Sequence, residues 1–218
     1  MSDADRLRWD ARHAAVGPGT PLPPDGLRGR LDLLPAVGRA LDLACGRGAV
    51  AVWLAQRGLV VDGVDVSGAA LTSARTLARS ASGTPPPASG TPPLASGTPS
   101  PASPTPGRGS ETPGSEGERV GAGAVRWIQA DLDAGMPVAG PYDLVVCQRF
   151  REPALYPALA DVLAPGGLLV ITVLSEVDDE PGPFRASPGE LATAFPTLET
   201  LAHEERNGEA TLIARAPR

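Results

Sequence analysis

The stretch from Ala40 to Ala55, ALDLACGRGAVAVWLA, constrains the fold of this chain more than any other part. It begins as a short apolar run with one acid, Asp42, breaks at Gly46-Arg47-Gly48, and resumes with apolar residues at helical spacing. This order predicts a strand, a glycine-rich turn and the start of a helix. A second apolar run ends at Asp65, and a glycine loop followed by such a carboxylate is what nucleotide-like cofactors need.

Apolar runs and segments with helical spacing alternate along most of the chain. We predict strands at 40–44, 60–64, 125–130, 142–147 and 168–174 and a final hairpin of 197–205 and 209–215 around Asn207-Gly208. We predict helices at 2–15, 27–34, 49–57, 69–79, 152–163 and 188–195. Ser67 should cap the fourth of these, and Ser187, in a capping box with Glu190, the last. This alternation is typical of a doubly wound α/β fold. The predicted architecture is a Rossmann-like sheet of seven strands, mostly parallel, with a C-terminal antiparallel hairpin.

A seven-residue repeat interrupts the alternation at residues 81–108: ASGTPPP, ASGTPPL, ASGTPSP and ASPTPGR. The repeat and the residues that follow it offer almost no side chains that bury apolar area, and prolines lack a backbone donor. We therefore expect a disordered insert at 80–124 within one domain at 39–218, preceded by a helical segment and linker at 1–38. A neutral loop is favoured over a partner-binding role for residues 81–118, because no basic residues flank the prolines.

Charge and cysteine content narrow the class of protein. The formal net charge is -6 at pH 7 and the arginines form no stripe, so we expect no nucleic-acid partner. Cys45 and Cys147 both lie in apolar runs, which favours free thiols and a reducing compartment, the cytoplasm. The sequence shows no leader and no long apolar stretch, so we expect no membrane association. Two histidines are too few for an imidazole-rich metal site, and we expect none.

The glycine loop alone also fits a dinucleotide, because residues 46–51 satisfy the GxGxx(G/A) pattern. Three features count against a dehydrogenase. Asp42 lies within the first strand and Cys45 precedes the loop, and a turn at 164–167 enters the fifth strand. The chain then ends in a hairpin, whereas a dehydrogenase continues its parallel winding. An NAD-dependent oxidoreductase is therefore the third hypothesis.

Five motifs in order, LDLACGRG, VDGVDVS, QADLD, YDLVVC and LAPGGLLVI, resemble the successive motifs of class I S-adenosylmethionine-dependent methyltransferases. The early WDARHAAVG and the late FRASPGELATAF and HEE resemble the small single-domain group that includes tellurite-resistance and thiopurine-type methyltransferases. The insert departs from this pattern. The resemblance implies an enzyme that transfers a methyl group from S-adenosylmethionine to an acceptor by in-line displacement.

The resemblance also implies a role for the residues of each motif. Four residues would wall the methionine part of the cofactor: Asp42, Ala44, Gly46 and Gly48. The others would bind the ribose (Asp65), pack on or bond the adenine (Val66, Asp131 and Leu132), lie near the methionine (Cys147) or face its carboxylate (Arg12). Simpler roles stay open: a helix N-terminal acid for Asp65, a turn for Asp131, loop support for Asp42, and small buried apolar groups for both cysteines.

The acceptor is less constrained by the sequence than the cofactor. The position after the fourth strand carries Cys147-Gln148-Arg149-Phe150 and no Asn/Asp-Pro-Pro-aromatic tetrad, so no catalytic residue is assigned. Four residues are candidates for the border of a substrate pocket: His13, Arg149, Arg151 and Glu176. The chain shows no second domain and no basic patch, which favours a small-molecule acceptor. The alternative is a non-catalytic cofactor-binding or interaction protein with the same fold; the acceptor atom and the oligomeric state stay open.

Overall fold

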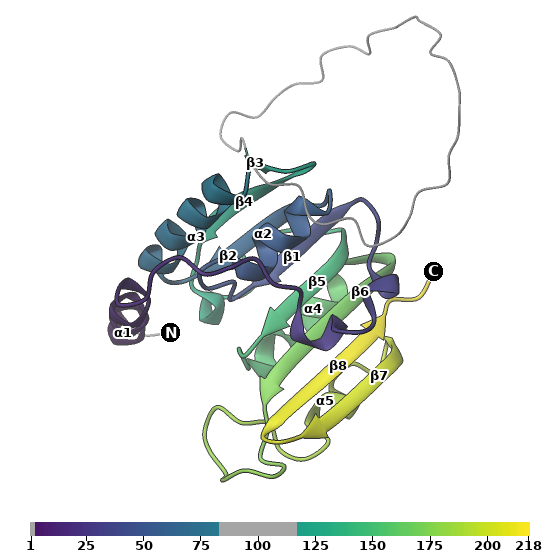
Figure 1. Ribbon diagram of the computed structural model, residues 1–218. Coiled ribbons are helices and arrows are strands. Elements are labelled where there is room, and N and C mark those ends of the chain that lie inside the picture. The colour runs from purple at the N-terminus through teal and green to yellow at the C-terminus, as the bar shows by residue number, and fades with distance from the viewer. Residues whose placement is uncertain (1–2, 83–116) are drawn as a thin grey trace, which may run out of the picture.

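The computed structural model describes residues 3–82 and 117–218, in which eight strands form one sheet (Figure 1). The strand order is β3-β4-β2-β1-β5-β6-β8-β7. The strands are β1 (Arg39–Leu43), β2 (Val60–Asp65), β3 (Glu118–Val120), β4 (Gly123–Gln129), β5 (Tyr142–Gln148), β6 (Leu163–Leu174), β7 (Glu199–Arg206) and β8 (Glu209–Arg215). The five central strands are parallel, and antiparallel strands close both edges. The predicted doubly wound α/β architecture is confirmed, with one strand more than expected.

Helices cover both faces of this sheet. They are α1 (Asp3–Ala14), α2 (Ala49–Gln56), α3 (Gly68–Ala81), α4 (Tyr156–Asp161) and α5 (Glu190–Ala194), with short 3-10 turns η1 (Asp25–Leu27), η2 (Leu31–Leu33), η3 (Leu132–Ala134) and η4 (Pro153–Leu155). Side chains of α2, α3 and η1 share one apolar cluster, and those of α4 and α5 share the other. Within the described ranges, every helix is too short or too polar to cross a membrane.

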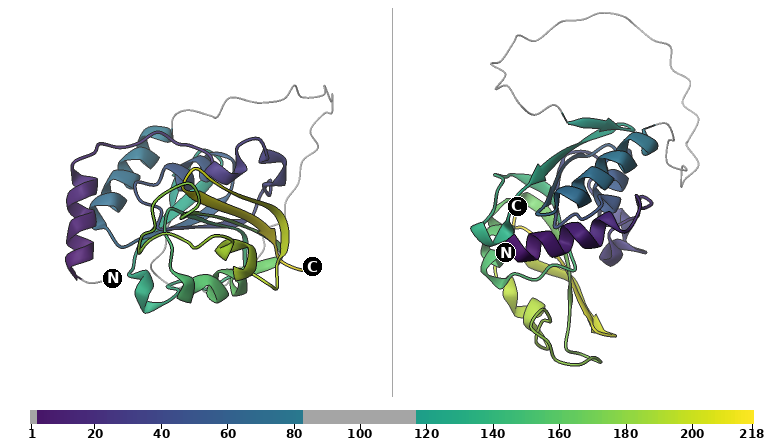
Figure 2. Two further views of the ribbon diagram at one scale, coloured as in Figure 1. Left: turned by 90° about the horizontal axis from the view of Figure 1, so that it is seen from below. Right: turned by 90° about the vertical axis from the view of Figure 1, so that its left-hand side faces the viewer.

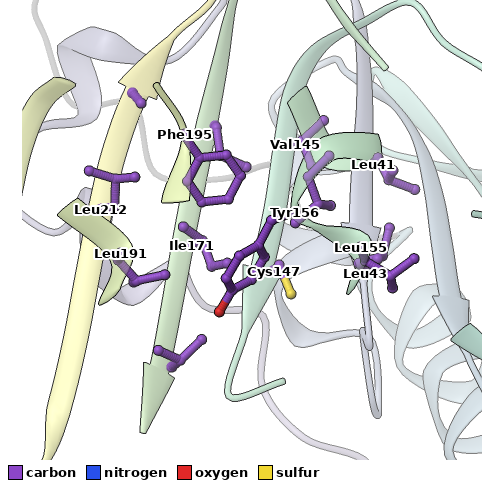
Figure 3. Close-up of a cluster of buried hydrophobic side chains, with 14 of the residues drawn as sticks. Leu41, Leu43, Val145, Cys147, Leu155, Tyr156, Ile171, Leu191, Phe195 and Leu212 are labelled. Atoms are coloured by element: carbon purple, nitrogen blue, oxygen red, sulfur yellow. The ribbon is translucent and has the colours of Figure 1, made fainter. Parts of the chain in front are cut away.

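The central strands β1, β2, β5 and β6 are largely buried because each is mainly apolar on both faces. Figure 3 shows the cluster beneath α4 and α5, where Leu43 of β1, Cys147 of β5 and Ile171 of β6 meet Tyr156 and Phe195. The rings of these last two residues lie 5.2 Å apart, centroid to centroid. Near-continuous apolar runs are what parallel strands covered on both sides require.

Several elements differ from the predicted ones for local reasons. The helix expected at 27–34 is two separate 3-10 turns, because Arg28 after η1 is extended and Gly29 has φ +81°. The helix expected at 152–163 begins as η4 and ends at Asp161, after which Leu163 already pairs with β5. The expected hydroxyl cap of α5 does not form. Of the two hydrogen bonds of a capping box, only the one from the Ser187 N–H to a Glu190 carboxylate oxygen is present, at 3.4 Å.

The predicted insert is bordered by ordered chain on both sides. Ser82 ends α3 and donates its hydroxyl to the carbonyl of Arg119 in β3 at 2.9 Å. Residues 118–120 and 123–129 form the β3–β4 hairpin, so the last residues assigned to the insert belong to the sheet. Most of the repeat lies in residues 83–116, which are outside the described residues.

The turn after β1 lies at the point where the order of the strands reverses direction. Strand β1 has β2 on one side and β5 on the other, and the chain leaves β1 toward one edge before returning to the other. The carboxyl ends of β1, β2, β4 and β5 therefore meet around the turn that follows β1. Ligands of open α/β sheets bind at such a reversal point.

Candidate functional site

The turn after β1 has a backbone that few residue types tolerate. Ala44, Gly46 and Gly48 have φ values of +52°, +53° and +76°. The Cys45 N–H donates to the carbonyl of Val64 in β2, and the Gly48 N–H donates back to Cys45, each at 2.9 Å. The turn thus folds onto the end of β2 and aims α2 away from the carboxyl edge. Glycine adopts such left-handed conformations at little cost.

Gly48 is also required by what packs against it. A Cβ at this position would lie 2.5 Å from Trp127 Cη2 and 2.7 Å from the Ala74 Cβ. A Cβ on Gly63, in the middle of β2, would lie 2.8 Å from the same ring. The indole of Trp127 therefore fills the space that two glycines leave under the loop, and it locks β4, α3 and the loop together.

Asp65, the last residue of β2, anchors the loop from the other side. Its side chain is buried, one carboxylate oxygen accepts the Gly46 N–H and the other accepts the Ser67 N–H, both at 2.8 Å. Burial raises the pKa of Asp65, and these two amides partly oppose the shift. Each oxygen has a further lone pair, so the carboxylate retains capacity for ligand hydroxyls. Val66 follows it directly and is 7% exposed.

Asp42, inside β1, is the most unusual group at the site. Its side chain is 3% exposed, and Oδ2 has no hydrogen-bond partner among the described residues. Burial raises the pKa of Asp42 to about 8; the Ala51 amide opposes the shift and the Asp65 charge adds to it. A buried, unpartnered carboxyl oxygen is rare in folded proteins and marks a place where a donor or a cation is accommodated.

Helix α1 contributes two residues that the sequence did not assign to the cofactor. It lies alongside α3, as Figures 1 and 2 show together. Asp10 accepts the Ser67 hydroxyl at 2.6 Å and the Ala69 N–H at 3.1 Å, at the start of α3. These contacts lower the pKa of Asp10. His13, one turn later, lies beside Gly46, since a Cβ there would be 3.7 Å from its imidazole. In the sequence, Asp10 and His13 are three residues apart, which places both side chains on one face of the helix; this spacing is the feature by which they could have been recognised.

The remaining predicted residues lie at neighbouring strand ends. Cys147 pairs beside Leu43 in the sheet, is 2% exposed, and its pKa is raised to about 12 by burial and by Asp42. Asp131 follows β4, which ends beside Asp65, and its carboxylate accepts the Asp133 N–H at 3.0 Å and begins η3. Leu132 is buried in the core.

The residues considered for a substrate border lie in separate places. Of these, His13 lies nearest the loop, as described above. Arg149 contacts Glu209 at 3.2 Å, and Arg151 forms a bidentate pair with Glu190 at 2.6 and 2.8 Å. Arg12, expected near the cofactor carboxylate, lies over the ring of Trp9 at 5.3 Å. The structure therefore groups Asp42, the loop glycines and Asp65 with His13. Arg149 and Arg151 form ion pairs away from this group.

Residues 41–86 match the family model described as "Methyltransferase domain". A 44-residue segment is 50% identical to ribosomal RNA small subunit methyltransferase C of Alcanivorax borkumensis, covering 20% of this chain and 14% of that protein.

Solved structures resemble most of the chain at low sequence identity. TehB from Haemophilus influenzae aligns over 86% of this chain and 60% of its own, with 18% identity and a TM-score of 0.60. A TehB-like S-adenosylmethionine-dependent methyltransferase from Corynebacterium glutamicum aligns over 99% and 97%, with 14% identity and a TM-score of 0.53. An S-adenosylmethionine-dependent methyltransferase from Mesorhizobium loti aligns over 84% and 94%, with 17% identity and a TM-score of 0.55. The chain spans 60% of TehB and 14% of the curated relative.

The residues present fit the cofactor of these proteins. The unpartnered oxygen of Asp42 suits a cationic or donor group, and the open lone pairs of Asp65 suit paired hydroxyls. A Cβ added to Gly46 would have one atom within 4 Å, the His13 Cε1 at 3.7 Å. The space beside the Gly46 backbone is therefore open enough for a ligand to approach it closely. The segment matched by the family model contains this loop.

Proposed function

We propose that this chain, which has the fold of the class I S-adenosylmethionine-dependent methyltransferases, transfers a methyl group from S-adenosylmethionine to a small-molecule acceptor. One observation carries the proposal: at the reversal point of the sheet, the loop after β1 is flanked by the buried Asp42, with its unpartnered oxygen, and by Asp65, which accepts the Gly46 N–H. When bound, the cofactor supplies a methyl group on a sulfonium sulfur, which is open to in-line attack.

Under this proposal, the chain binds and orients the cofactor and the acceptor, and it does not itself supply a nucleophile. Asp65 receives the ribose hydroxyls while keeping the Gly46 and Ser67 amides in place. Asp42 faces the positively charged methionine end, and its ionisation there neutralises the ligand charge in a site from which water is largely excluded. Val66, Leu132 and Asp131 are assigned to the adenine.

No general base is needed for the transfer itself. The Cys147 thiol stays protonated at neutral pH, because its pKa is raised to about 12. Alignment of two reactants can supply on the order of 7–11 kcal/mol of the barrier. An acceptor that is already a good nucleophile, such as a thiolate or an oxyanion, therefore needs only positioning and exclusion of water.

A small acceptor is favoured over RNA, although one matched relative is named as an RNA methyltransferase. The formal net charge of -6 opposes binding to a phosphate backbone, which depends on clustered cations. Both cysteines are free thiols, which suits the cytoplasm or another reducing compartment.

Ligand-dependent thermal unfolding tests the cofactor assignment. S-adenosylmethionine and its demethylated product should each raise the melting temperature, whereas NAD should not. Stabilisation by NAD alone would overturn the proposal. Release of the demethylated product in the presence of thiols, phenols, oxyanions and a short RNA then identifies the acceptor. Turnover with the RNA alone would contradict the small-molecule assignment.

A further inference from the structure

A cavity of about 340 Å³ lies between η1 and the β7–β8 hairpin. Its walls include Asp25, Arg28 and Arg30 from the N-terminal segment and Glu204, Arg206 and Glu209 from the hairpin. Ala202, Thr211 and Ile213 also line it. The hairpin lies at the edge of the sheet, with β5, β6 and η1 between this cavity and the loop after β1. The cavity is therefore a different place from the cofactor site.

The charges around this cavity do not balance. Arg30 and Arg206 contact the two oxygens of Glu204 at 2.8 and 2.7 Å, and Arg28 contacts Asp25 at 3.0 Å. On the side toward β5, Arg149 lies 3.2 Å from Glu209 and 3.7 Å from Asp25. The cavity lining holds three guanidinium groups and three carboxylates. Arg149, outside the lining but beside Glu209 and Asp25, adds a fourth guanidinium group and with it one positive charge, in a protein whose net charge is -6.

The hydrogen-bonding capacity is unbalanced in the same direction. Four guanidinium groups carry about twenty N–H donors, whereas three carboxylates offer about twelve acceptor sites. The side chains of Arg28 and Arg206 are 60% and 70% exposed, so their ion pairs are weak and exchangeable. A ligand that brings acceptor oxygens and negative charge uses this surplus of donors.

We propose that this cleft is a second binding site, separate from the cofactor loop, that takes a small organic anion. The acidic group lies between Arg30 and Arg206, and the apolar body of the ligand lies along Ala202. The cavity volume falls within the ordinary range for small-molecule sites. The proposal concerns binding alone and does not rest on methyl transfer.

Titration of the isotope-labelled protein with three probes tests it: benzoate, phenyl phosphate and the neutral benzamide. We expect at least one of the two anions to shift the backbone amide signals of residues 202–211, with an affinity about ten-fold or more above that of benzamide. The better anion distinguishes a carboxylate site from a phosphate site. Equal binding of all three probes, or shifts only near residues 42–48, would overturn the proposal.

Paired substitutions separate binding from folding. Arg30→Gln combined with Arg206→Gln should weaken anion binding about ten-fold or more, whereas Arg57→Gln, which alters an arginine stacked 4.3 Å from the Trp53 ring, should not. Glu204→Gln should instead strengthen binding, because it frees both guanidinium groups from their carboxylate. A loss of binding in Glu204→Gln with the fold intact would contradict the assignment.

Discussion

Gly48 and Gly29 have nearly the same backbone conformation in very different surroundings. Their φ values are +76° and +81°, but a Cβ meets Trp127 and Ala74 at Gly48 and nothing within 4 Å at Gly29. We expect Gly29→Ala to cost about 1–2 kcal/mol from the left-handed backbone alone. Gly48→Ala should cost about 1–3 kcal/mol more, because the new methyl group overpacks the loop. Denaturant unfolding of the two variants measures the difference, and equal costs would contradict this packing of Trp127.

Asp42 predicts an unusual dependence of stability on pH. Its pKa is raised to about 8 in the folded protein, above the value of about 3.9 in an unfolded chain. Between these values the folded state holds a proton that the unfolded state has lost, so this residue makes stability fall as pH rises from about 4 to about 8. Asp42→Asn should flatten that slope in thermal unfolding. An unchanged slope in the variant would show that Asp42 ionises normally.

Asp65 connects the loop to the proposed ribose contact. Asp65→Asn keeps an acceptor for one amide but loses the charge and half of the paired acceptors, so we expect the affinity for the demethylated cofactor to fall about ten-fold or more. Calorimetric titration measures it, and Asp161→Asn, on the exposed end of α4, is the matched control. Unchanged affinity in a folded Asp65→Asn variant would remove this residue from the site.

At the scale of elements, the Asp10 carboxylate links α1 to the start of α3. Asp10 accepts both the Ser67 hydroxyl and the Ala69 amide, which also completes the N-terminus of α3. We expect Asp10→Ala to increase hydrogen exchange throughout α1 while leaving β1 and β5 protected. Cofactor affinity should fall as well, since His13 loses its position beside Gly46. Unaltered exchange in α1 would mean that other contacts hold this helix.

The elements also show where prediction from sequence succeeds. The first two strands, the glycine loop and the cap of α3 were predicted correctly, because each depends on residues a few positions apart; Ser67 does accept the Ala70 N–H. Asp10 was missed because its partner Ser67 lies 57 residues away. Strand β3 was missed because its three residues carry little apolar pattern and are ordered only by pairing with β4.

At the scale of the whole molecule, the sheet order explains why distant motifs form one site. Parallel pairing of β4, β2, β1 and β5 brings four strand ends to a single edge, so residues as far apart as Asp42 and Cys147 become neighbours. The sequence predicted this edge from the alternation of elements. It did not predict the second cleft, because η1 and the β7–β8 hairpin, which form it, lie more than 170 residues apart in the chain; Arg30 and Glu204, for example, are 174 residues apart.

The same topology predicts that residues 83–116 are dispensable for folding. The residues on either side of this segment lie together: Ser82 donates its hydroxyl to the Arg119 carbonyl at 2.9 Å, and Arg79 pairs with Glu118 at 3.1 Å. A linker of about four Gly and Ser residues is long enough to join them.

Replacing residues 83–116 by such a linker should leave the melting temperature unchanged or higher, since a shorter loop closes at a lower entropic cost, by about 0.6 kcal/mol for each halving of its length. Cofactor affinity, measured by the same calorimetric titration, should not change, because the loop after β1 and Asp65 keep all their described contacts. As a control, a deletion extended through Val120 removes β3 and the Trp127–Glu118 contact of 3.3 Å, and it should lower the melting temperature. If the shorter deletion alone destabilised the protein, residues 83–116 would have to contribute contacts to the folded domain.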